Sequence, residues 1–334
     1  MKIIVPMAGI GKRMRPHTLT VPKPLVPIAG KPIVTRLVED IAKVSGQKID
    51  EVAFIIGDFG KEVEQKLLDV AKSIGAKGSI YYQDKPLGTA HAILCAKESL
   101  EGPVIVAFAD TLFKADFKLE AEKDGIIWVH KVDDPKPFGV VQLAADGSIN
   151  NFVEKPETFV SDLAIIGIYY FKDGKYLRSE LQYLLDNDIK DKGEYQITNA
   201  LDNMKNKGSK FYPGAVIEWL DCGNKNSTVF TNQRYLEFIK DEKLVSPKAK
   251  ITNSVIIEPV FISDNVEITD SVVGPHVSVG VGTKITHSIV KNSIIQENTH
   301  IKDALISDSI LGSHASFKGK FSDLSVGDYN QIVQ

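Results

Sequence analysis

The sequence predicts an α/β protein in which a doubly wound, mostly parallel sheet is followed by a short parallel β-helix. Two observations predict this fold. Through about residue 240, apolar runs of strand length alternate with amphipathic runs of helix length, which is typical of βαβ units. After Ser246-Pro247, apolar residues recur at every sixth position instead. We therefore expect two domains, residues 1–240 and residues 247–334.

The first domain is expected to alternate strands and helices along the chain. The expected strands are Lys2–Pro6, Glu51–Ile56, Ser79–Gln83, Val104–Ala109, Ile126–His130, Gly139–Leu143 and Ile165–Phe171. The expected helices are Pro32–Val44, Lys61–Ile74, Thr89–Leu100, Tyr176–Asn187, Thr198–Lys207 and Ser227–Lys240. Proline suits the first turn of a helix, which supports the start at Pro32. Asp146-Gly147 and Asp173-Gly174 are turn signals and indicate hairpins inserted into the sheet or laid against it.

The second domain shows two overlapping repeats. Ile256, Ile262 and Ile268 begin the six-residue apolar series, and a serine followed by two aliphatic residues recurs at Ser254 and Ser271, 17 residues apart. A triangular parallel β-helix needs one inward residue per face in each coil, which matches these repeats. An amphipathic helix would repeat every 3.6 residues instead. We expect about four coils, with corner loops where the six-residue repeat slips.

The overall composition excludes several classes of partner. The 334 residues include 40 basic and 43 acidic ones, so the net charge of −3 favours neither nucleic acid nor an anionic membrane, and anion binding has to be local. Lys2 and Pro6 enclose too few apolar residues for a signal peptide or a membrane span, so we expect a cytoplasmic protein. Cys95 and Cys222 match no metal or redox spacing, and no disulfide framework is expected.

The first expected strand leads into a loop of glycines and cations, Met7-Ala8-Gly9-Ile10-Gly11-Lys12-Arg13. Glycine loops after a first strand let backbone N–H groups approach an anion closely. A dinucleotide-binding fingerprint needs a third glycine where this chain has Met14, and a Walker A loop needs serine or threonine where Arg13 stands. What remains is a glycine loop with its own guanidinium, suited to bidentate contact with a triphosphate.

Pro22-Lys23-Pro24 adds a second cation with restricted backbone freedom. Both prolines have a fixed φ, and a residue before proline is biased towards extended geometry, so the backbone directs Lys23 with little entropic cost. The alternative interpretation of the loop and of Lys23 is a surface segment with solvated charges.

Two aspartates follow apolar runs in the way that ligand-binding residues of open α/β sheets do. Asp110 comes after Val104–Ala109, and Asp221 comes after Val216–Leu220. Ligands bind at the carboxyl ends of such strands. Two carboxylates together with phosphate oxygens form a hard-oxygen shell that suits Mg²⁺. The alternative for either aspartate is a helix N-cap or a turn.

The spaced pattern Gly9-x-Gly11-x-Arg13-x-x-Pro16-x-Thr18-x-x-x-Pro22-Lys23-Pro24-Leu25 closely resembles the signature of the sugar-1-phosphate nucleotidylyltransferases. Further motifs follow in that family's order: Gln83, Leu87-Gly88-Thr89-Ala90, Asp110, Phe138-Gly139-Val140-Val141, Val153-Glu154-Lys155-Pro156, Gly167-Ile168-Tyr169, Gly193-Glu194-Tyr195-Gln196-Ile197-Thr198 and Trp219-Leu220-Asp221-Cys222-Gly223. The resemblance covers residues 1 to about 240 and implies a Rossmann-like nucleotidyltransferase sheet. The later repeats look like the left-handed β-helix that many members carry.

The resemblance implies a Mg²⁺-dependent reaction. The phosphate oxygen of a sugar 1-phosphate attacks the α-phosphorus of a nucleoside triphosphate, which gives an NDP-sugar and pyrophosphate. The implied catalytic residues are Arg13, Lys23, Asp110, Lys155 and Asp221, of which Asp110 and Asp221 would hold the metal. The implied nucleotide-binding residues are Ala8, Gly9, Gly11, Lys12, Arg13, Lys23, Gln83, Gly88 and Thr89. The implied sugar-phosphate residues are Gly139, Glu154, Lys155, Gly167 and Glu194.

Without the resemblance, Glu154 and Lys155 would be interpreted as an exposed charge pair, Gln83 as the end of a strand and Gly88 as a turn. Lys12 either adds a phosphate contact or lies on the rim of the loop.

The choice of substrates stays open at this stage. The Gln83 region resembles members that use pyrimidine nucleotides, so dTTP or UTP with glucose 1-phosphate is favoured over GTP with mannose 1-phosphate. Thr111 and Phe138 depart from the residues most common in the family, which leaves the sugar undecided. A non-catalytic homologue that binds a sugar nucleotide and regulates a partner is the alternative. The β-helix histidines raise a further alternative, an acyltransferase. The β-helix is expected to support a homo-oligomer.

Overall fold

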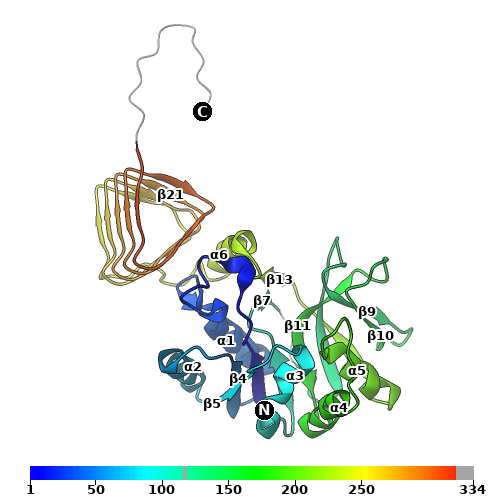
Figure 1. Ribbon diagram of the computed structural model, residues 1–334. Helices are drawn as coiled ribbons and strands as arrows, with labels where there is room; N and C mark the ends of the chain where they lie inside the picture. Colours follow the sequence, from blue (N-terminus) through cyan, green and yellow to red (C-terminus); the bar gives the residue numbers. More distant parts are fainter. Residues whose placement is uncertain (116–118, 321–334) are drawn as a thin grey trace. The chain divides into compact units, whose positions relative to one another are not determined.

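The computed structural model describes residues 1–115 and 119–320, so the end of the expected second domain, residues 321–334, lies outside the described residues (Figure 1). The chain divides into two compact units. The first consists of Met1–Val26 and Lys31–Ser227, and the second of Pro27–Gly30 and the residues from Thr228 onwards. The helix that precedes the repeats thus belongs mostly to the second unit, and so does a short segment from the opening part of the chain.

The first unit is built on a mixed sheet with strand order β10-β9-β11-β6-β1-β4-β5, and β8 and β12 continue it from β11. Its strands are β1 Lys2–Pro6, β4 Glu51–Ile56, β5 Lys77–Tyr82, β6 Val104–Ala107, β8 Gly125–Lys131, β9 Gly139–Leu143, β10 Ile149–Glu154, β11 Leu163–Phe171 and β12 Phe211–Ala215. The four neighbouring strands β6, β1, β4 and β5 are parallel, whereas β11 is antiparallel to β6. The predicted α/β class with a mostly parallel mixed sheet is confirmed.

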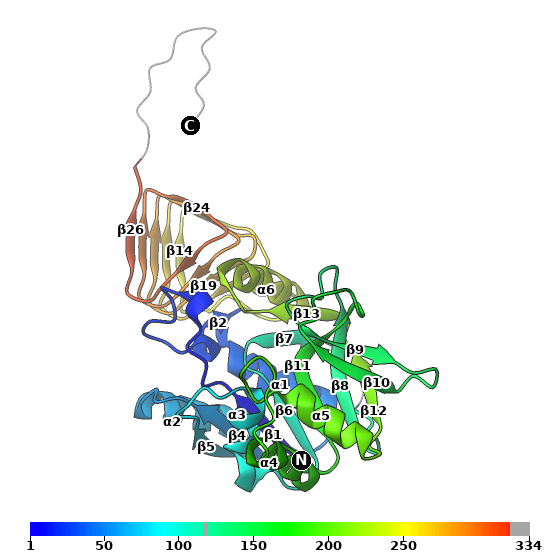
Figure 2. The same ribbon diagram turned by 45° about the vertical axis from the view of Figure 1, so that its right-hand side comes forward.

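Helices cover both faces of this sheet. They are α1 Ile33–Ser45, α2 Lys61–Ser73, α3 Thr89–Leu94, α4 Gly174–Asp186 and α5 Ile197–Asn206. Helices α3, α4 and α5 contact one another and share one apolar core with the sheet (Figure 2). In β1, Ile4 belongs to that core, while Ile3 and Val5 are equally buried and point to the opposite face. Burial on both faces explains why the central strands are continuous apolar runs.

Two sequence-based expectations for this unit are wrong. The helix expected over Thr89–Leu100 ends at Leu94 and is followed by the 3₁₀ turn η3, Lys97–Ser99. Ser99 in this turn is buried, and its hydroxyl donates to Glu51 Oε1 at 2.9 Å. Asp173-Gly174 forms no hairpin, because the Asp173 side chain accepts hydrogen bonds from two backbone N–H groups and caps the start of α4.

The turn at Asp146-Gly147 does connect a hairpin, formed by β9 and β10. A separate antiparallel pair joins β7 Thr111–Lys114 to β13 Glu218–Asp221, with Asp221 opposite Thr111. The remaining short elements are β2 Pro27–Ile28, β3 Lys31–Pro32 and the 3₁₀ turns η1 Lys12–Met14 and η2 Lys23–Leu25. Among the described residues, no helix has the length and apolar character that crossing a membrane requires.

The second unit contains a left-handed parallel β-helix with a triangular cross-section (Figure 1). Its three parallel sheets have the strand orders β14-β17-β20-β23-β26, β15-β18-β21-β24 and β16-β19-β22-β25. The strands are β14 Lys250–Thr252, β15 Val255–Ile256, β16 Val260–Ile262, β17 Glu267–Thr269, β18 Val272–Val273, β19 Val277–Val279, β20 Lys284–Thr286, β21 Ile289–Lys291, β22 Ile294–Ile295, β23 His300–Lys302, β24 Leu305–Ser307, β25 Ile310–Leu311 and β26 Ser316–Lys318. The number of strands in each sheet matches the expected four or so coils.

The two sequence repeats have separate structural roles in the coils. Most of the six-residue apolar series fills the interior, where Ile262, Ile268 and Ile285 are almost fully buried. The expectation is wrong for Ile289, Leu305 and Phe317 of the same series, which are exposed, and Val290 and Ile306 point inwards instead. The serine repeat forms a ladder, because the backbone N–H of Ser271 donates to Ser254 Oγ at 3.1 Å and that of Ser288 donates to Ser271 Oγ at 3.0 Å. Each serine therefore links its coil to the next one.

Helix α6, Lys225–Phe238, is joined to the β-helix through the buried Asn232. Asn232 Oδ1 accepts from the Ala29 backbone N–H at 2.9 Å and from Ser278 Oγ at 2.7 Å. The segment Pro27–Gly30, helix α6 and the β-helix are therefore hydrogen-bonded to one another through the Asn232 side chain, which explains why they form a single unit.

Candidate active site

A cleft of about 430 Å³ lies at the carboxyl ends of the central parallel strands of the first unit. The segments that follow β1, β5 and β6 all contribute to it, as the position of ligand sites in open α/β sheets predicts. The residues that line it are Pro6, Met7, Ala8, Gly9, Gly11, Lys12, Arg13, Lys23, Pro24, Gln83, Pro86, Gly88, Thr89, Ala92, Phe108, Ala109, Asp110, Glu194 and Gly223. All the nucleotide-binding residues expected from the sequence are in this lining.

The glycine loop after β1 folds back on itself at Gly11, whose φ of 63° lies in the left-handed region. The Gly11 carbonyl accepts from Thr18 Oγ1 at 2.8 Å and from the Met14 backbone N–H at 2.9 Å. A Cβ at this position would lie 3.0 Å from Cβ of Lys23. The loop can therefore approach Lys23 closely only with glycine at residue 11.

Lys23 is held inside the cleft by a carboxylate. Its side chain is almost fully buried, and Nζ lies 3.0 Å from Asp110 Oδ2. The 3₁₀ turn η2, with Pro24 in its first turn, fixes the direction of the side chain. Because a buried ammonium needs a partner, this ion pair keeps a cation beside the cleft before any anion binds.

Arg13 and Asp221 converge on Gly223. A Cβ on Gly223 would lie 2.8 and 2.9 Å from the two Asp221 carboxylate oxygens and 3.2 Å from Nη2 of Arg13. The Gly223 backbone N–H also donates to Asp221 Oδ1 at 2.9 Å. The position needs glycine because a side chain would push these charged groups apart.

The two expected metal ligands lie on neighbouring segments, and of the two only Asp110 lines the cleft. The backbone N–H of Cys222 donates to the Asp110 carbonyl at 2.9 Å, which ties the ends of both segments together. Carboxylates are the hard oxygen donors that Mg²⁺ takes, usually one or two together with phosphate oxygens. Over residues 1–115 and 119–320, no cluster of three histidine, cysteine or acidic side chains offers a competing metal site.

Gln83 and Gly88 form one wall of the cleft. Gln83 directly follows β5, and its Nε2 donates to the Gly88 carbonyl at 3.3 Å. Gly88 has a φ of 113°, and a Cβ there would lie 2.5 Å from the Tyr195 carbonyl oxygen. Thr89 fastens this wall, because its hydroxyl donates to Gln196 Oε1 at 3.0 Å and accepts from the Ile197 backbone N–H at 2.9 Å.

Four of the expected sugar-phosphate residues lie outside the lining of this cleft. Glu154 is opposite Gly139 in the β9–β10 hairpin, and a Cβ on Gly139 would lie 3.0 Å from Glu154 Oε2. Lys155 has a φ of 44°, and its Nζ lies 3.5 Å from Glu154 Oε1. Gly167 is connected to the cleft through its carbonyl, which accepts from the Phe108 backbone N–H at 3.0 Å.

Glu194 is the exception, because it lines the same cleft as the expected nucleotide-binding residues. One of its carboxylate oxygens accepts from Gln196 Nε2 at 3.0 Å.

Burial and the nearby charge of Glu154 raise the pKa of Tyr169 far above its ordinary value, so this phenol stays protonated beside the β9–β10 hairpin.

Sequence reasoning missed three lining residues that carry part of the geometry. Phe108 lies between the cleft and Gly167, and Pro86 precedes the Leu-Gly-Thr motif. Gly223 leaves room for the Arg13 guanidinium because it has no side chain. Pro86 and Gly223 belong to or adjoin motifs that the sequence already singled out. Phe108 gave no signal of its own, because in the sequence it is one more apolar residue of the expected strand Val104–Ala109.

A family model described as nucleotidyl transferase matches residues 2–237. The chain belongs to the nucleotidyl transferase family. A protein named bifunctional protein GlmU from Methanococcus maripaludis is 33% identical over 327 residues, which cover 96% of this chain and 76% of that protein. A glucose-1-phosphate thymidylyltransferase from Streptomyces antibioticus is 32% identical over 287 residues, which cover 78% of each protein.

The fold is similar to that of a solved structure. A solved structure of UDP-glucose pyrophosphorylase complexed with UDP-glucose superimposes with a TM-score of 0.59 at 24% identity, covering 71% of this chain and 98% of that one. Within its family, the chain belongs with the sugar-1-phosphate nucleotidyltransferases, whose substrates are a nucleoside triphosphate and a sugar 1-phosphate.

Proposed function

We propose that the protein condenses a hexose 1-phosphate with a nucleoside triphosphate to give an NDP-sugar and pyrophosphate. The observation that carries this proposal is that Arg13, Lys23 and Asp110 line one cleft behind a glycine loop, while Asp221 lies outside the lining and adjoins it at Gly223. Two polyanions have to be brought together for this reaction, and the cations that line the cleft, Lys12, Arg13 and Lys23, would suit a triphosphate. Membership of the family supports the reaction class.

In the proposed reaction the backbone of Gly9 and Gly11 approaches the triphosphate, and Lys12 lies at the same loop. A phosphate oxygen of the sugar phosphate, gripped by Lys155, attacks the α-phosphorus in line with the leaving pyrophosphate. Arg13 and Lys23 neutralise the charge that grows on that leaving group. Glu154 accepts hydrogen bonds from sugar hydroxyls, and the bare backbone at Gly139 and Gly167 lets the hexose come close. Glu194, which lines the cleft, also contributes to binding of the sugar phosphate in this proposal.

Asp110 and Asp221 are the residues that would hold Mg²⁺, which when bound would supply Lewis-acid stabilisation of phosphate oxygens. The ion pair between Lys23 and Asp110 has a consequence for this arrangement. Asp110, which would help to hold the cation, already balances the charge of Lys23, so a bound cation and Lys23 would share this carboxylate.

We propose dTTP or UTP with glucose 1-phosphate as the first substrates to test, and GTP with mannose 1-phosphate as the second. The purified protein is incubated with each of four nucleoside triphosphates in combination with several sugar 1-phosphates. The pyrophosphate released from each pair is measured and decides between them. Turnover with one pair supports an active enzyme. A protein that binds NDP-sugar but turns over no pair would be the non-catalytic regulatory homologue.

We also propose that the chain forms a homo-oligomer through the β-helix. Val255, Val272, Ile289 and Leu305 are aligned across the sheet formed by β15, β18, β21 and β24. Leu305 is 79% exposed and Val255 is 56% exposed, which is unusual for an aligned apolar row. A second copy would cover it. Light scattering at micromolar concentration should give a multiple of the chain mass, and Leu305→Asp should reduce that mass, whereas a monomeric wild type contradicts the proposal.

A further inference from the structure

Gln83 does not stand alone at the cleft, because a histidine behind it holds its amide. His91 belongs to α3, and its Nδ1 lies 3.0 Å from Gln83 Nε2. His91 is half-buried and is not part of the cleft lining, whereas Gln83 is. The contact therefore joins a residue that faces the ligand space to one that does not.

The chemistry of the neighbours decides which way round the amide lies. The Gly88 carbonyl oxygen can only accept, so the atom of Gln83 that faces it must be the NH₂ group. The second proton of that NH₂ group then points to His91 Nδ1, which must be unprotonated and accept it, while Nε2 carries the ring proton. Burial lowers the pKa of His91, which favours this neutral ring at physiological pH.

Both amide protons of Gln83 are used by these two acceptors. Among the residues that the structure describes, Gln83 Oε1 has no donor within hydrogen-bonding distance. Gly88 alone would hold the amide weakly, because that bond is 3.3 Å long and the same carbonyl already accepts from the Ala92 backbone N–H at 3.1 Å.

We propose that His91 is a positioning residue that fixes the Gln83 amide with its oxygen directed at the base, so that the cleft selects bases presenting an N–H donor. This inference rests on the proposed function only in taking a nucleotide as the ligand. Uracil and thymine present N3–H, and guanine presents N1–H. Cytosine and adenine have an unprotonated ring nitrogen at the corresponding edge, which would face the amide oxygen without a proton between them.

The test measures nucleotide binding, so it does not depend on turnover. Calorimetry gives Kd for UTP, dTTP, GTP, CTP and ATP with the wild type, His91→Leu and His91→Asn. In His91→Leu the Gln83 amide loses its second acceptor and is free to rotate by 180°. The ratio of the Kd for CTP or ATP to the Kd for the best N–H base should therefore fall by about tenfold or more. In His91→Asn the side-chain oxygen can replace Nδ1 as acceptor, so the preference should stay close to that of the wild type.

A second measurement needs no variant. The ¹⁵N chemical shifts of the His91 ring in the wild-type protein should report an unprotonated Nδ1 and a protonated Nε2. A protonated Nδ1 overturns the proposal, and so does a wild type that binds CTP or ATP most tightly. Equal loss of affinity for all bases in His91→Leu would assign the residue a purely structural role. Absence of turnover with normal base selectivity would reject the proposed reaction and leave this inference intact.

Discussion

At the scale of single residues, Arg13 and Lys23 line the cleft, and we propose that they bind the triphosphate. Their proposed role in stabilising the departing pyrophosphate predicts that Arg13→Ala and Lys23→Ala each lower kcat by more than they weaken nucleotide binding. Loss of one such charge typically costs about 10²- to 10³-fold in rate. Steady-state kinetics together with a measured Kd for the nucleotide check this. Equal losses in rate and in binding would place both residues in ground-state binding only.

Asp110 makes a separate prediction, because it is paired with Lys23 in this structure and is proposed to hold the cation. Asp110→Asn removes the charge and keeps the size, so the Mg²⁺ concentration needed for half-maximal activity should rise by about tenfold or more. A titration of activity against Mg²⁺ measures it. Glu194→Gln, which changes a cleft carboxylate outside the proposed metal pair, is the matched control. An unchanged Mg²⁺ dependence of Asp110→Asn would reject its assignment as a ligand.

At the scale of secondary-structure elements, the serine ladder makes the coils of the β-helix depend on buried hydroxyls. Ser271 Oγ donates to the Thr269 carbonyl at 2.7 Å and accepts from the Ser288 backbone N–H at 3.0 Å. Ser271→Ala leaves that buried N–H unpaired and should cost about 1–3 kcal/mol of unfolding free energy. Ser254→Ala, at the less buried start of the ladder, should cost less because water can replace the hydroxyl. Denaturant unfolding of both variants makes the comparison.

The same elements show what the sequence could predict. The inward six-residue series and the strands Lys2–Pro6 and Glu51–Ile56 were predicted because burial forces a regular apolar pattern. Strand β10 was not predicted, since Asn150 and Asn151 interrupt its apolar residues and pairing with β9 across the Asp146-Gly147 turn is what makes it extended. Local propensity is weaker than such tertiary pairing.

In the candidate site, too, features set by local sequence were predicted and features set by tertiary pairing were not. Asp110 and Asp221 were predicted because each directly follows an apolar run, but their link through Cys222 depends on the β7–β13 pairing between segments far apart in the chain. The β-helix histidines were a weak signal for acyl transfer. His276, His287 and His314 have positive φ at corners of the coils, a conformation in which histidine is enriched together with asparagine and aspartate, whereas His300 lies in β23. Their recurrence thus has a backbone explanation.

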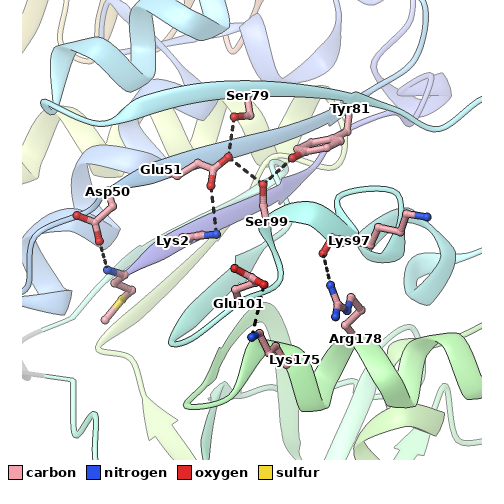
Figure 3. A network of polar contacts seen from close by, with 11 residues as sticks. Lys2, Asp50, Glu51, Ser79, Tyr81, Lys97, Ser99, Glu101, Lys175 and Arg178 are labelled. Carbon is pink, nitrogen blue, oxygen red and sulfur yellow. Dashed lines mark hydrogen bonds and ion pairs between the residues drawn. The ribbon is translucent and has the colours of Figure 1, made fainter.

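At the scale of the whole molecule, the first unit separates its ligand cleft from a polar network that stabilises the fold. The cleft lies at the carboxyl ends of the parallel strands, whereas Glu51 lies at the amino-terminal end of β4 (Figure 3). Its carboxylate accepts from Ser79 Oγ at 2.6 Å and Ser99 Oγ at 2.9 Å, and Lys2 Nζ lies 3.4 Å away. Tyr81 in turn donates to the Ser99 hydroxyl at 2.8 Å.

This separation predicts a change in stability without a change in chemistry. Burial alone would raise the pKa of Glu51, but the hydrogen bonds from Ser79 and Ser99 and the charge of Lys2 outweigh it and lower the pKa below its ordinary value. A carboxyl group with a lowered pKa in the folded state stabilises the protein above its unfolded pKa of about 4.3, and this contribution is lost as pH falls through the folded pKa.

Glu51→Gln should therefore lower the melting temperature at pH 7 by about 1–2 °C, the shift expected for about 1 kcal/mol in a chain of 334 residues. The difference from the wild type should narrow as the pH falls below about 4, because the wild-type carboxyl group then becomes neutral as well. Glu101→Gln breaks an exposed ion pair with Lys175 and should change little. Because the network lies at the opposite ends of the strands from the cleft, kcat of Glu51→Gln should equal that of the wild type, and a large loss of kcat at full folding would contradict the separation.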